Sequence, residues 1–198
     1  MKAKPDPRLV FLDLETTGLL PGDDVVLEIG IVITDVRFKV LETWATTIQT
    51  PDALDRIHSA YVRKMHTESG LLADLPSGVR CVTDAEVEAI KVLKNAGFKE
   101  GTATLAGYCP HFDRSFLHRH MPVLDAFFDY RMIDVSTLRG MARRLVDADI
   151  DEKLRTAFGD TKHRTIADCV AALNELEFYV RNFLDLDGLR KAMQDQRN

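Results

Sequence analysis

The sequence predicts an α/β protein with a mixed five-stranded sheet that is flanked by helices. Three observations lead to this prediction: three strand-like segments come first, short strands then alternate with helices, and no repeat or low-complexity linker divides the chain. A chain of 198 residues suits one domain with a full hydrophobic core. We therefore expect a single domain over 1–198, with its core at about residues 8–184 and a short C-terminal extension at 185–198.

The first three expected strands lie between residues 9 and 48. Residues 9–12 form an apolar run, which is typical of a strand that is buried on both faces of a sheet. Residues 25–34 and 40–48 have the composition of two further strands. The turn around Asp35 that joins them indicates a hairpin or a meander.

The expected elements of the second half alternate between helix and strand. They are a helix at 84–98, a strand at 104–107, a helix that begins near 111 and is interrupted at Pro122, a strand at 131–133, a helix that ends at 145 and a helix at 166–183. We expect Thr83 or Asp84 to be the N-cap of the first of these helices. Residues 147–161 are polar and fit either a loop or a weak helix.

The composition is that of an ordinary globular protein with an acidic balance. Hydrophobic residues make up 45% of the chain and charged residues 29%, with a formal net charge of -5. No basic face stands out, although proteins that grip long nucleic acids by the backbone usually have one. Bound divalent cations can supply positive charge to an acidic protein, so a phosphodiester substrate stays possible. The balance favours a small substrate over a long polymer.

The cysteine positions and the absence of apolar spans bear on the compartment. Cys81, Cys109 and Cys169 contain no CxxC pair, which disfavours a disulfide framework or a zinc knuckle. The sequence shows neither a signal peptide nor an apolar run long enough to span a bilayer. These features predict a cytoplasmic protein without a membrane partner.

Two carboxylates stand at the end of the first expected strand. Residues i and i+2 of a strand face the same side, so Asp13 and Glu15 project together from an apolar strand. Two like charges are costly to bury unless a cation lies between them, and a hard divalent cation suits carboxylates. The simpler alternative is that the strand runs out into solvent here, and the pair alone does not exclude it.

Asp113, Asp168 and His163 complete a candidate site, although each also has a plain structural explanation. Asp113 lies in the first turn of a helix, where acidic residues stabilise the N-terminus. Asp168 follows Thr165 as in a capping box, and His163 in the preceding loop fits a solvated side chain. In combination, the four carboxylates can instead hold two divalent ions about 4 Å apart for displacement at phosphorus. A histidine beside them can accept a proton from water, because histidine titrates near neutral pH.

Five segments carry a resemblance to a known family. DLETTGL at 13–19, HFDRSFL around Asp113 and HRTIAD at 163–168 resemble the motifs of the DEDDh exonuclease superfamily, and MHTESGL at 65–71 and DYRMIDVSTL at 129–138 are similar to oligoribonucleases within it. The resemblance covers about residues 9–183. It implies a ribonuclease H-like exonuclease fold, two divalent metal ions (Mg²⁺ or Mn²⁺) and a homodimer. The implied activity is 3′→5′ degradation of short single-stranded RNA, down to and including dinucleotides, to 5′-mononucleotides by two-metal-ion hydrolysis.

The resemblance also implies a role for each site residue. The catalytic carboxylates that hold the metals would be Asp13, Glu15, Asp113 and Asp168, and the general base would be His163. The substrate-binding residues would be Leu19, Tyr61, His66, Cys109, Tyr130, Arg131, Ser136 and Thr137. Leu19 would wedge against the terminal base, Tyr61 and His66 would hold the other nucleoside, and Tyr130 would reach in from the partner subunit. The other four would form a cap over the 5′ phosphate.

Simpler explanations exist for several of these substrate-binding residues. Leu19 fits plain packing, and Tyr61 and Tyr130 fit contacts at the edge of the core or at a dimer interface. Ser136 fits an N-cap, and Arg131 fits an ion pair with a structural carboxylate.

The chain departs from the family pattern at several places, and the stretch at 147–161 is atypical in sequence. Tyr108 and Cys109 stand where the family has Asn-Ser, Tyr61 replaces a tryptophan, and Ala167 replaces an acidic residue. A thiol is a weaker hydrogen-bond donor than a hydroxyl, so the cap is expected to be looser and longer substrates are compatible with it. We also expect Glu28, which interrupts the second strand, to pair with a polar group inside the fold.

Two other functions stay open. A DNA-directed or general DEDDh 3′→5′ exonuclease shares the metal site but should lack the segments at 65–71 and 129–138. A non-catalytic nucleotide-binding protein on the same fold would not need His163 as a base. Matched cleavage of RNA and DNA tests the first alternative, and turnover in Mn²⁺ tests the second.

Overall fold

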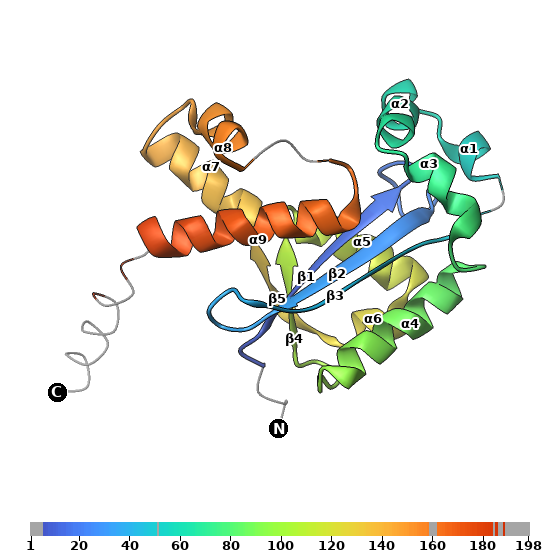
Figure 1. Cartoon of the computed structure of the whole chain (residues 1–198), viewed down its shortest axis with the longest axis horizontal. Coiled ribbons are helices and arrows are strands. Elements are labelled where there is room, and N and C mark those ends of the chain that lie inside the picture. The colour runs from blue at the N-terminus through green and yellow to red at the C-terminus, as the bar shows by residue number, and fades with distance from the viewer. Residues whose placement is uncertain (1–5, 51, 159–161, 184, 186–187, 189–198) are drawn as a thin grey trace.

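A mixed five-stranded sheet forms the centre of the molecule (Figure 1). The computed structural model describes residues 6–50, 52–158, 162–183, 185 and 188. The strands are β1 (Leu9–Thr16), β2 (Val26–Thr34), β3 (Val40–Thr47), β4 (Ala103–Gly107) and β5 (Phe128–Asp134). Their order is β3-β2-β1-β4-β5, in which β1 to β3 pair antiparallel and β4 pairs parallel with both β1 and β5. The predicted fold class is confirmed.

Helices cover both faces of this sheet. They are α1 (Ala53–Arg56), α2 (Ala60–Glu68), α3 (Leu71–Asp74), the 3-10 helix η1 (Leu75–Ser77), α4 (Val82–Asn95), α5 (Pro110–His120), α6 (Pro122–Asp125), α7 (Val135–Leu145), α8 (Ile150–Phe158) and α9 (Thr165–Asn182). One apolar cluster joins the sheet to α4, α5 and α6, and a second joins it to α7, α8 and α9. The sheet therefore lies between two helical layers (Figure 1).

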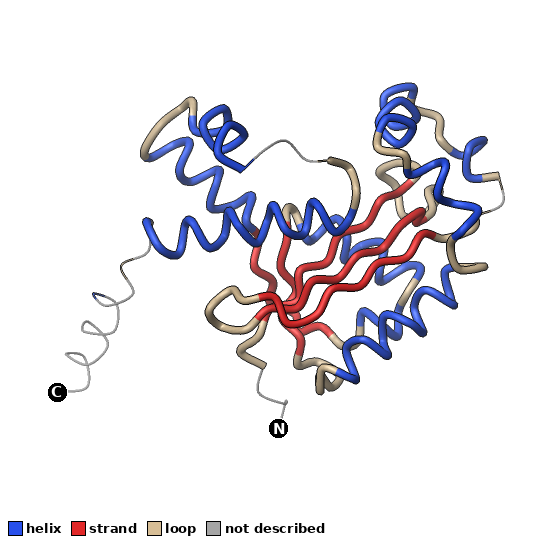
Figure 2. The backbone as a smooth tube through the Cα atoms, in the orientation of Figure 1, coloured by secondary structure: helices blue, strands red, loops and turns tan. Residues whose placement is uncertain are grey.

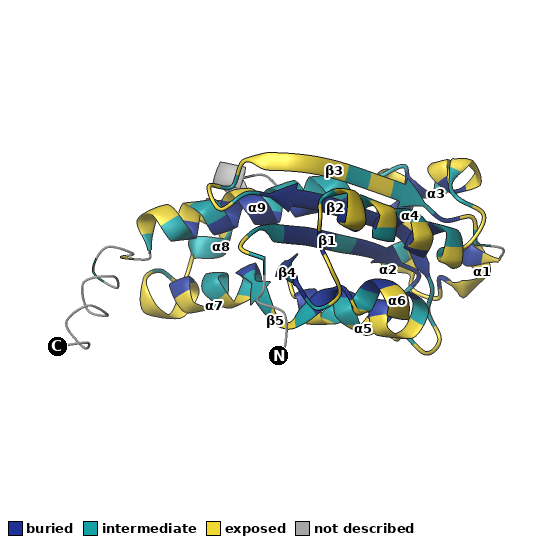
Figure 3. Ribbon diagram, turned by 90° about the horizontal axis from the view of Figure 1, so that it is seen from below, coloured by how far each residue is buried: buried dark blue, intermediate teal, exposed yellow. Residues whose placement is uncertain are grey.

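The two layers divide the side chains of β1. Val10, Leu12 and Leu14 belong to the cluster with α4 to α6, whereas Phe11 belongs to the cluster with α9. Because side chains alternate along a strand, Asp13 and Glu15 lie on the α9 face together with Phe11. Strand β2 is buried along its whole length, and β3 at the edge is largely exposed (Figure 3). Burial on both faces explains the apolar runs in β1 and β2.

The α9 face is polar at the end where β1 finishes. Helix α2 and the first turn of α9 both lie at this end of the sheet (Figure 2). Nε2 of His66 in α2 lies 2.9 Å from the carbonyl oxygen of Thr16, the last residue of β1. Three segments that are far apart in the sequence therefore meet here.

Several element boundaries differ from the sequence predictions. The N-cap of α4 is Cys81, so the prediction of Thr83 or Asp84 was wrong, and both lie inside the first turn. Strand β5 is longer than 131–133, because its pairing with β4 begins at Phe128. Residues 150–158 form α8, which selects the helical alternative for this polar stretch. Residues 159–161 and most of the predicted C-terminal extension at 185–198 lie outside the described residues.

The helix starts also exclude two structural explanations that the sequence left open. The N-cap of α7 is Asp134, whose side chain accepts a hydrogen bond from the backbone N–H of Ser136 at 2.9 Å, so Ser136 is not the cap. The N-cap of α9 is Arg164, and Thr165 is already helical, so Thr165 and Asp168 do not form a capping box. Among the described residues, no helix is long and apolar enough to cross a membrane.

Candidate active site

The structure brings the predicted carboxylates and histidine to the end of β1. Single ligand atoms of Glu15, His163 and Asp168 all lie within 4.8 Å of one another. Asp113, in the first turn of α5, accepts a hydrogen bond from the backbone N–H of Leu14 at 2.9 Å, which ties α5 to the same strand. The alternative that β1 runs out into solvent is therefore wrong, because Glu15 and Asp113 are both buried.

Burial raises the pKa values of these carboxylates, and at Asp13 and Glu15 the neighbouring negative charges raise them further. Burial raises the pKa of Asp13 well above its usual range, and the negative charges of Asp113, Glu15 and Asp168 raise it further. Burial likewise raises the pKa of Glu15 to about 8, with Asp168 as the largest charge effect. Burial also raises the pKa of Asp113 to about 8.

Asp168 is the member of the cluster with the most direct stabilisation from the backbone. Burial raises its pKa, while hydrogen bonds from backbone N–H groups oppose this effect. Its Oδ1 accepts one of them from Lys162 at 3.0 Å. Without a cation, clustered carboxylates of this kind are disfavoured in their ionised form, and a divalent ion would reverse that penalty. The residues present therefore fit a divalent metal centre.

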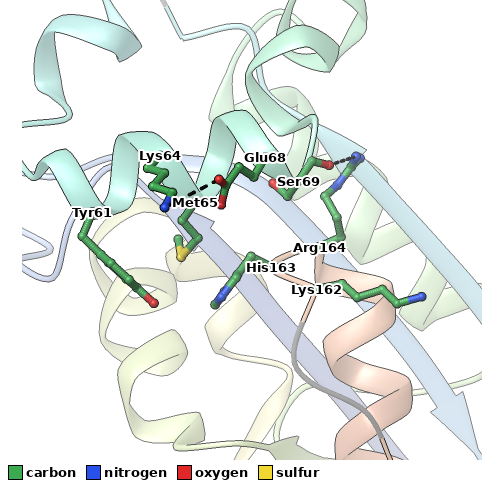
Figure 4. Close-up of a pocket in the computed structure, with 8 residues that line it drawn as sticks. All are labelled: Tyr61, Lys64, Met65, Glu68, Ser69, Lys162, His163 and Arg164. Carbon is green, nitrogen blue, oxygen red and sulfur yellow. Dashed lines mark hydrogen bonds and ion pairs between the residues drawn. The ribbon is translucent and has the colours of Figure 1, made fainter.

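His163 stands at the mouth of the cluster in an unusual backbone conformation. Its φ angle is 50°, which is left-handed and uncommon for a residue other than glycine. The residue is half-buried and lines a cavity of about 520 Å³ between α2 and the start of α9. The cavity is bordered by Tyr61, Lys64, Met65, Glu68, Ser69, Lys162, His163 and Arg164 (Figure 4). An imidazole that is partly open to such a cavity can exchange a proton with a water or a ligand bound there.

Leu19 and the two predicted tyrosines are accessible. Leu19 is 74% exposed, Tyr61 69% and Tyr130 61%, so none of the three is a core side chain. The plain-packing explanation of Leu19 is therefore wrong. Of the three, Tyr61 borders the cavity beside His163.

His66 lies in a different environment from the one predicted. Its side chain has no exposed surface. The carbonyl oxygen of Thr16 lies 2.9 Å from its Nε2, which assigns the ring proton to Nε2, and its Nδ1 lies 3.7 Å from Oε2 of Glu15. In this conformation the ring touches the end of β1 and cannot contact a nucleoside. Burial also lowers the pKa of the imidazole, which favours its neutral form.

Three of the predicted cap residues gather around one carboxylate that the sequence reasoning missed. Asp134 accepts hydrogen bonds from the backbone N–H of Cys109 at 3.1 Å, from the N–H of Ser136 at 2.9 Å and from Oγ1 of Thr137 at 3.0 Å. The N–H and the thiol of Cys109 both also lie within hydrogen-bond distance of the Ser136 hydroxyl. An aspartate directly before Val-Ser-Thr at a helix start was the available signal for this role.

Arg131 lies apart from that group. Its guanidinium is 3.6 Å from Oδ1 of Asp129 and lies 4.3 Å from the centre of the Tyr130 ring. The ion pair with a structural carboxylate that the sequence left open is therefore present. Since Arg131 remains largely exposed, the pair does not prevent contact with an anionic ligand.

Glu28 pairs with polar groups inside the fold, as predicted. Its carboxylate accepts hydrogen bonds from Nη2 of Arg164 at 2.8 Å and from the backbone N–H of Thr165 at 3.0 Å. Glu28 is also the register partner of Glu15 across β1 and β2. Arg164 was not predicted as part of the site, although it follows His163 directly.

Comparison with known proteins agrees with this geometry. The profile of a family described as exonuclease matches residues 10–176. The oligoribonuclease of Leifsonia xyli subsp. xyli is 38% identical over 182 residues, which is 89% of this chain and 84% of that protein. The oligoribonuclease of Thiobacillus denitrificans is 33% identical over 177 residues, which is 89% of this chain and 94% of that protein.

Solved structures of exonuclease I share the fold. The zinc-bound E. coli exonuclease I in complex with single-stranded DNA has a TM-score of 0.62 at 17% identity, over 90% of this chain and 41% of that one. Exonuclease I from Methylocaldum szegediense has a TM-score of 0.61 at 18% identity, over 93% of this chain and 43% of that one. This chain therefore spans less than half of those enzymes, and the likeness concerns the fold alone.

The mixed sheet and the carboxylate cluster at the end of β1 define a metal-dependent exonuclease of ribonuclease H-like fold. Within that class, the identity to curated relatives over most of their length decides the family. The chain belongs to the oligoribonuclease family.

Proposed function

We propose that this chain removes nucleotides singly from the 3′ end of short single-stranded RNA, down to and including dinucleotides, by two-metal-ion hydrolysis. Its family makes it a 3′→5′ exoribonuclease that acts on short RNA. The observation that carries the mechanistic part is the approach of Glu15, His163 and Asp168 to within 4.8 Å of one another. A protein that only bound nucleotides would have no need of a titratable imidazole beside its carboxylates.

The proposed metal ligands are Asp13, Glu15, Asp113 and Asp168, and the proposed ions are Mg²⁺ or Mn²⁺. Carboxylate oxygens are the donors that these hard cations prefer. Two such ions, when bound, would supply Lewis acidity toward the phosphodiester and stabilise the charge that develops as its bond breaks. The raised pKa of Glu15 means that binding would release protons at neutral pH, which gives the metal affinity a pH dependence.

His163 is the proposed general base. Its ring is half-buried and lines the cavity beside Glu15 and Asp168, so a water in the cavity can reach it. It would accept the proton of the water that attacks the terminal phosphodiester.

The substrate would be held from two sides. Leu19 and Tyr61 present exposed surface near the end of β1, and stacking of a base on an aromatic ring is worth about 1–3 kcal/mol. We propose that Cys109, Ser136 and Thr137, together with Arg131, bind the 5′ phosphate. His66 would join this set only after movement of α2, since its ring is buried.

The oligomeric state and the location belong to the same proposal. We propose a homodimer in which the exposed Tyr130 of one subunit reaches the substrate of its partner. The predicted cytoplasmic location fits an enzyme that finishes RNA decay.

The test is cleavage of 5′-phosphorylated RNA oligomers of two to seven nucleotides, with Mn²⁺ and with a chelator. Rapid metal-dependent loss of the dinucleotide, with release of 5′-mononucleotides, is the expected result. A preference for the longer oligomers would refute the dinucleotide part and indicate an open site. Equal or faster cleavage of matched DNA would contradict the RNA selectivity, and nucleotide binding without turnover would support a non-catalytic protein.

A further inference from the structure

The backbone of His163 needs support from its surroundings. Its left-handed φ of 50° is disfavoured for a side chain with a Cβ atom. Such conformations persist when neighbouring contacts determine them, and they are frequent at functional sites. The contacts on either side of His163 are therefore informative about how the proposed base is held.

Backbone N–H groups on both sides of His163, one residue before it and two residues after it, donate to carboxylates. The backbone N–H of Lys162 donates to Oδ1 of Asp168 at 3.0 Å on one side. On the other side the N–H of Thr165 donates to Oε2 of Glu28 at 3.0 Å. Hydrogen bonds therefore connect the segment around His163 to Asp168 in the first turn of α9 and to Glu28 in strand β2.

The side chain of Arg164 adds a third anchor that crosses to α2 and α3. Its Nη2 donates to Oε1 of Glu28 at 2.8 Å, and its Nη1 donates to Oδ2 of Asp74 at 2.8 Å. Nη1 also lies 3.5 Å from the carbonyl oxygen of Ser69. The guanidinium points toward Ser69 and away from the His163 ring (Figure 4). Through these contacts Arg164, which also borders the cavity, links the His163 loop to two other elements.

The burial of Glu28 makes its contact with Arg164 sensitive to geometry. The Glu28 side chain is 5% exposed, and the other residues of the strand are apolar except for Thr34 at its end. A buried carboxylate needs a partner with good geometry, and the planar fork of arginine meets that need better than lysine does. Glu28 is the register partner of Glu15. The contacts of Arg164 with Glu28 therefore fix the His163 loop relative to β1, the strand that carries Asp13 and Glu15.

We infer that Arg164 and Glu28 form a positioning pair that sets the place of the His163 imidazole relative to Glu15 and Asp168. The inference rests on the proposed function, in which His163 is the base. Neither residue touches the reacting atoms, so both act through His163. The pair also couples the base to the α2–α3 segment that borders the cavity.

A double-mutant cycle tests this role. The variants are Arg164→Met, His163→Ala and the combination, assayed on short RNA at saturating Mn²⁺ so that metal affinity does not enter. Arg164→Met should lower kcat on the order of tenfold to a hundredfold, a part of what a general base contributes, with KM nearly unchanged. In the His163→Ala background the same substitution should have no further effect. Losses that multiply would overturn the inference.

The conservative and control variants separate positioning from general damage. Arg164→Lys should recover part of the lost kcat, since a lysine reaches Glu28 as a point charge without the fork. Arg181→Met, which removes an exposed ion pair with Glu177 on the same helix, should leave kcat at the wild-type value. If Arg164→Met does not fold, Glu28→Gln takes its place, because it removes the charge and keeps an acceptor for Thr165.

A second readout does not depend on turnover. The ring signals of His163, assigned by their loss in His163→Ala, are followed by NMR in the Mg²⁺-loaded protein. Arg164→Met should shift these signals and leave those of the exposed His118 in place. Unchanged His163 signals in the folded variant would refute the positioning role. If Arg164→Met shifts these signals but the wild-type protein cleaves no RNA, the proposed function is refuted and the positioning role of Arg164 is kept.

Discussion

The stability of the metal-free protein should depend on pH in a way that the carboxylate cluster determines. Burial, together with the charges of Asp168 and Glu28, raises the pKa of Glu15 from 4.5 to about 8. A rise of that size costs the ionised carboxylate on the order of 5 kcal/mol in the folded state. Because Asp13 and Asp113 titrate in the same cluster and share protons with Glu15, this is an upper value for Glu15 alone.

The sign follows from proton binding. Between pH 4.5 and about 8 the folded chain holds a proton on Glu15 that the unfolded chain has lost, so stability falls as the pH rises through this interval. In a chelator, we expect the titration of Glu15 to contribute a drop of roughly 2–4 kcal/mol in the free energy of unfolding from pH 5 to pH 8. Mn²⁺ at about a hundred times its dissociation constant should restore about 2.7 kcal/mol at pH 8.

Urea unfolding at four pH values measures this effect without the screening that a salt denaturant introduces. Glu15→Gln is the matched control, because it keeps the size of the side chain and removes its titration. Its free energy of unfolding should fall less steeply with pH than that of the wild type. Equal slopes for the two proteins, or a wild-type stability that rises from pH 5 to pH 8, would refute the reasoning.

Three further predictions concern single side chains. His163→Ala should lower kcat on short RNA by about 10²- to 10⁴-fold with an unchanged thermal midpoint, and full activity would remove the base assignment. Tyr130→Ala should reduce activity in a confirmed dimer while calorimetric Mn²⁺ binding stays intact, and unchanged kinetics would contradict its role across the interface. Arg139 donates from Nε to the buried Glu175 at 2.9 Å, so Arg139→Met should cost about 3 kcal/mol in urea unfolding. The exposed pair of Arg143 is the control, and an equal loss in Arg143→Met would show that Glu175 gains little from its partner.

Short-range patterns predicted most of the elements and the chemistry of the site. The two-residue period of a strand placed Asp13 and Glu15 on one face, and the structure has both on the α9 side. Helical spacing likewise predicted α9, which runs over Thr165–Asn182. Boundaries were less accurate, as at α4, because Cys81 precedes the helix without a side-chain cap bond and so leaves no capping signal in the sequence.

The sequence by itself determined which residues are acidic, which lie at element ends and which family the motifs resemble. Only the tertiary structure decided that Glu15, His163 and Asp168 meet and that His66 is buried against the end of β1. It also decided that Arg164, at the start of α9, reaches Glu28 in β2. The physical reason is the difference in sequence distance over which these effects act. Periodicity and capping act over a few residues, whereas the approach of β1, α2 and α9 depends on how two helical layers pack against opposite faces of one sheet.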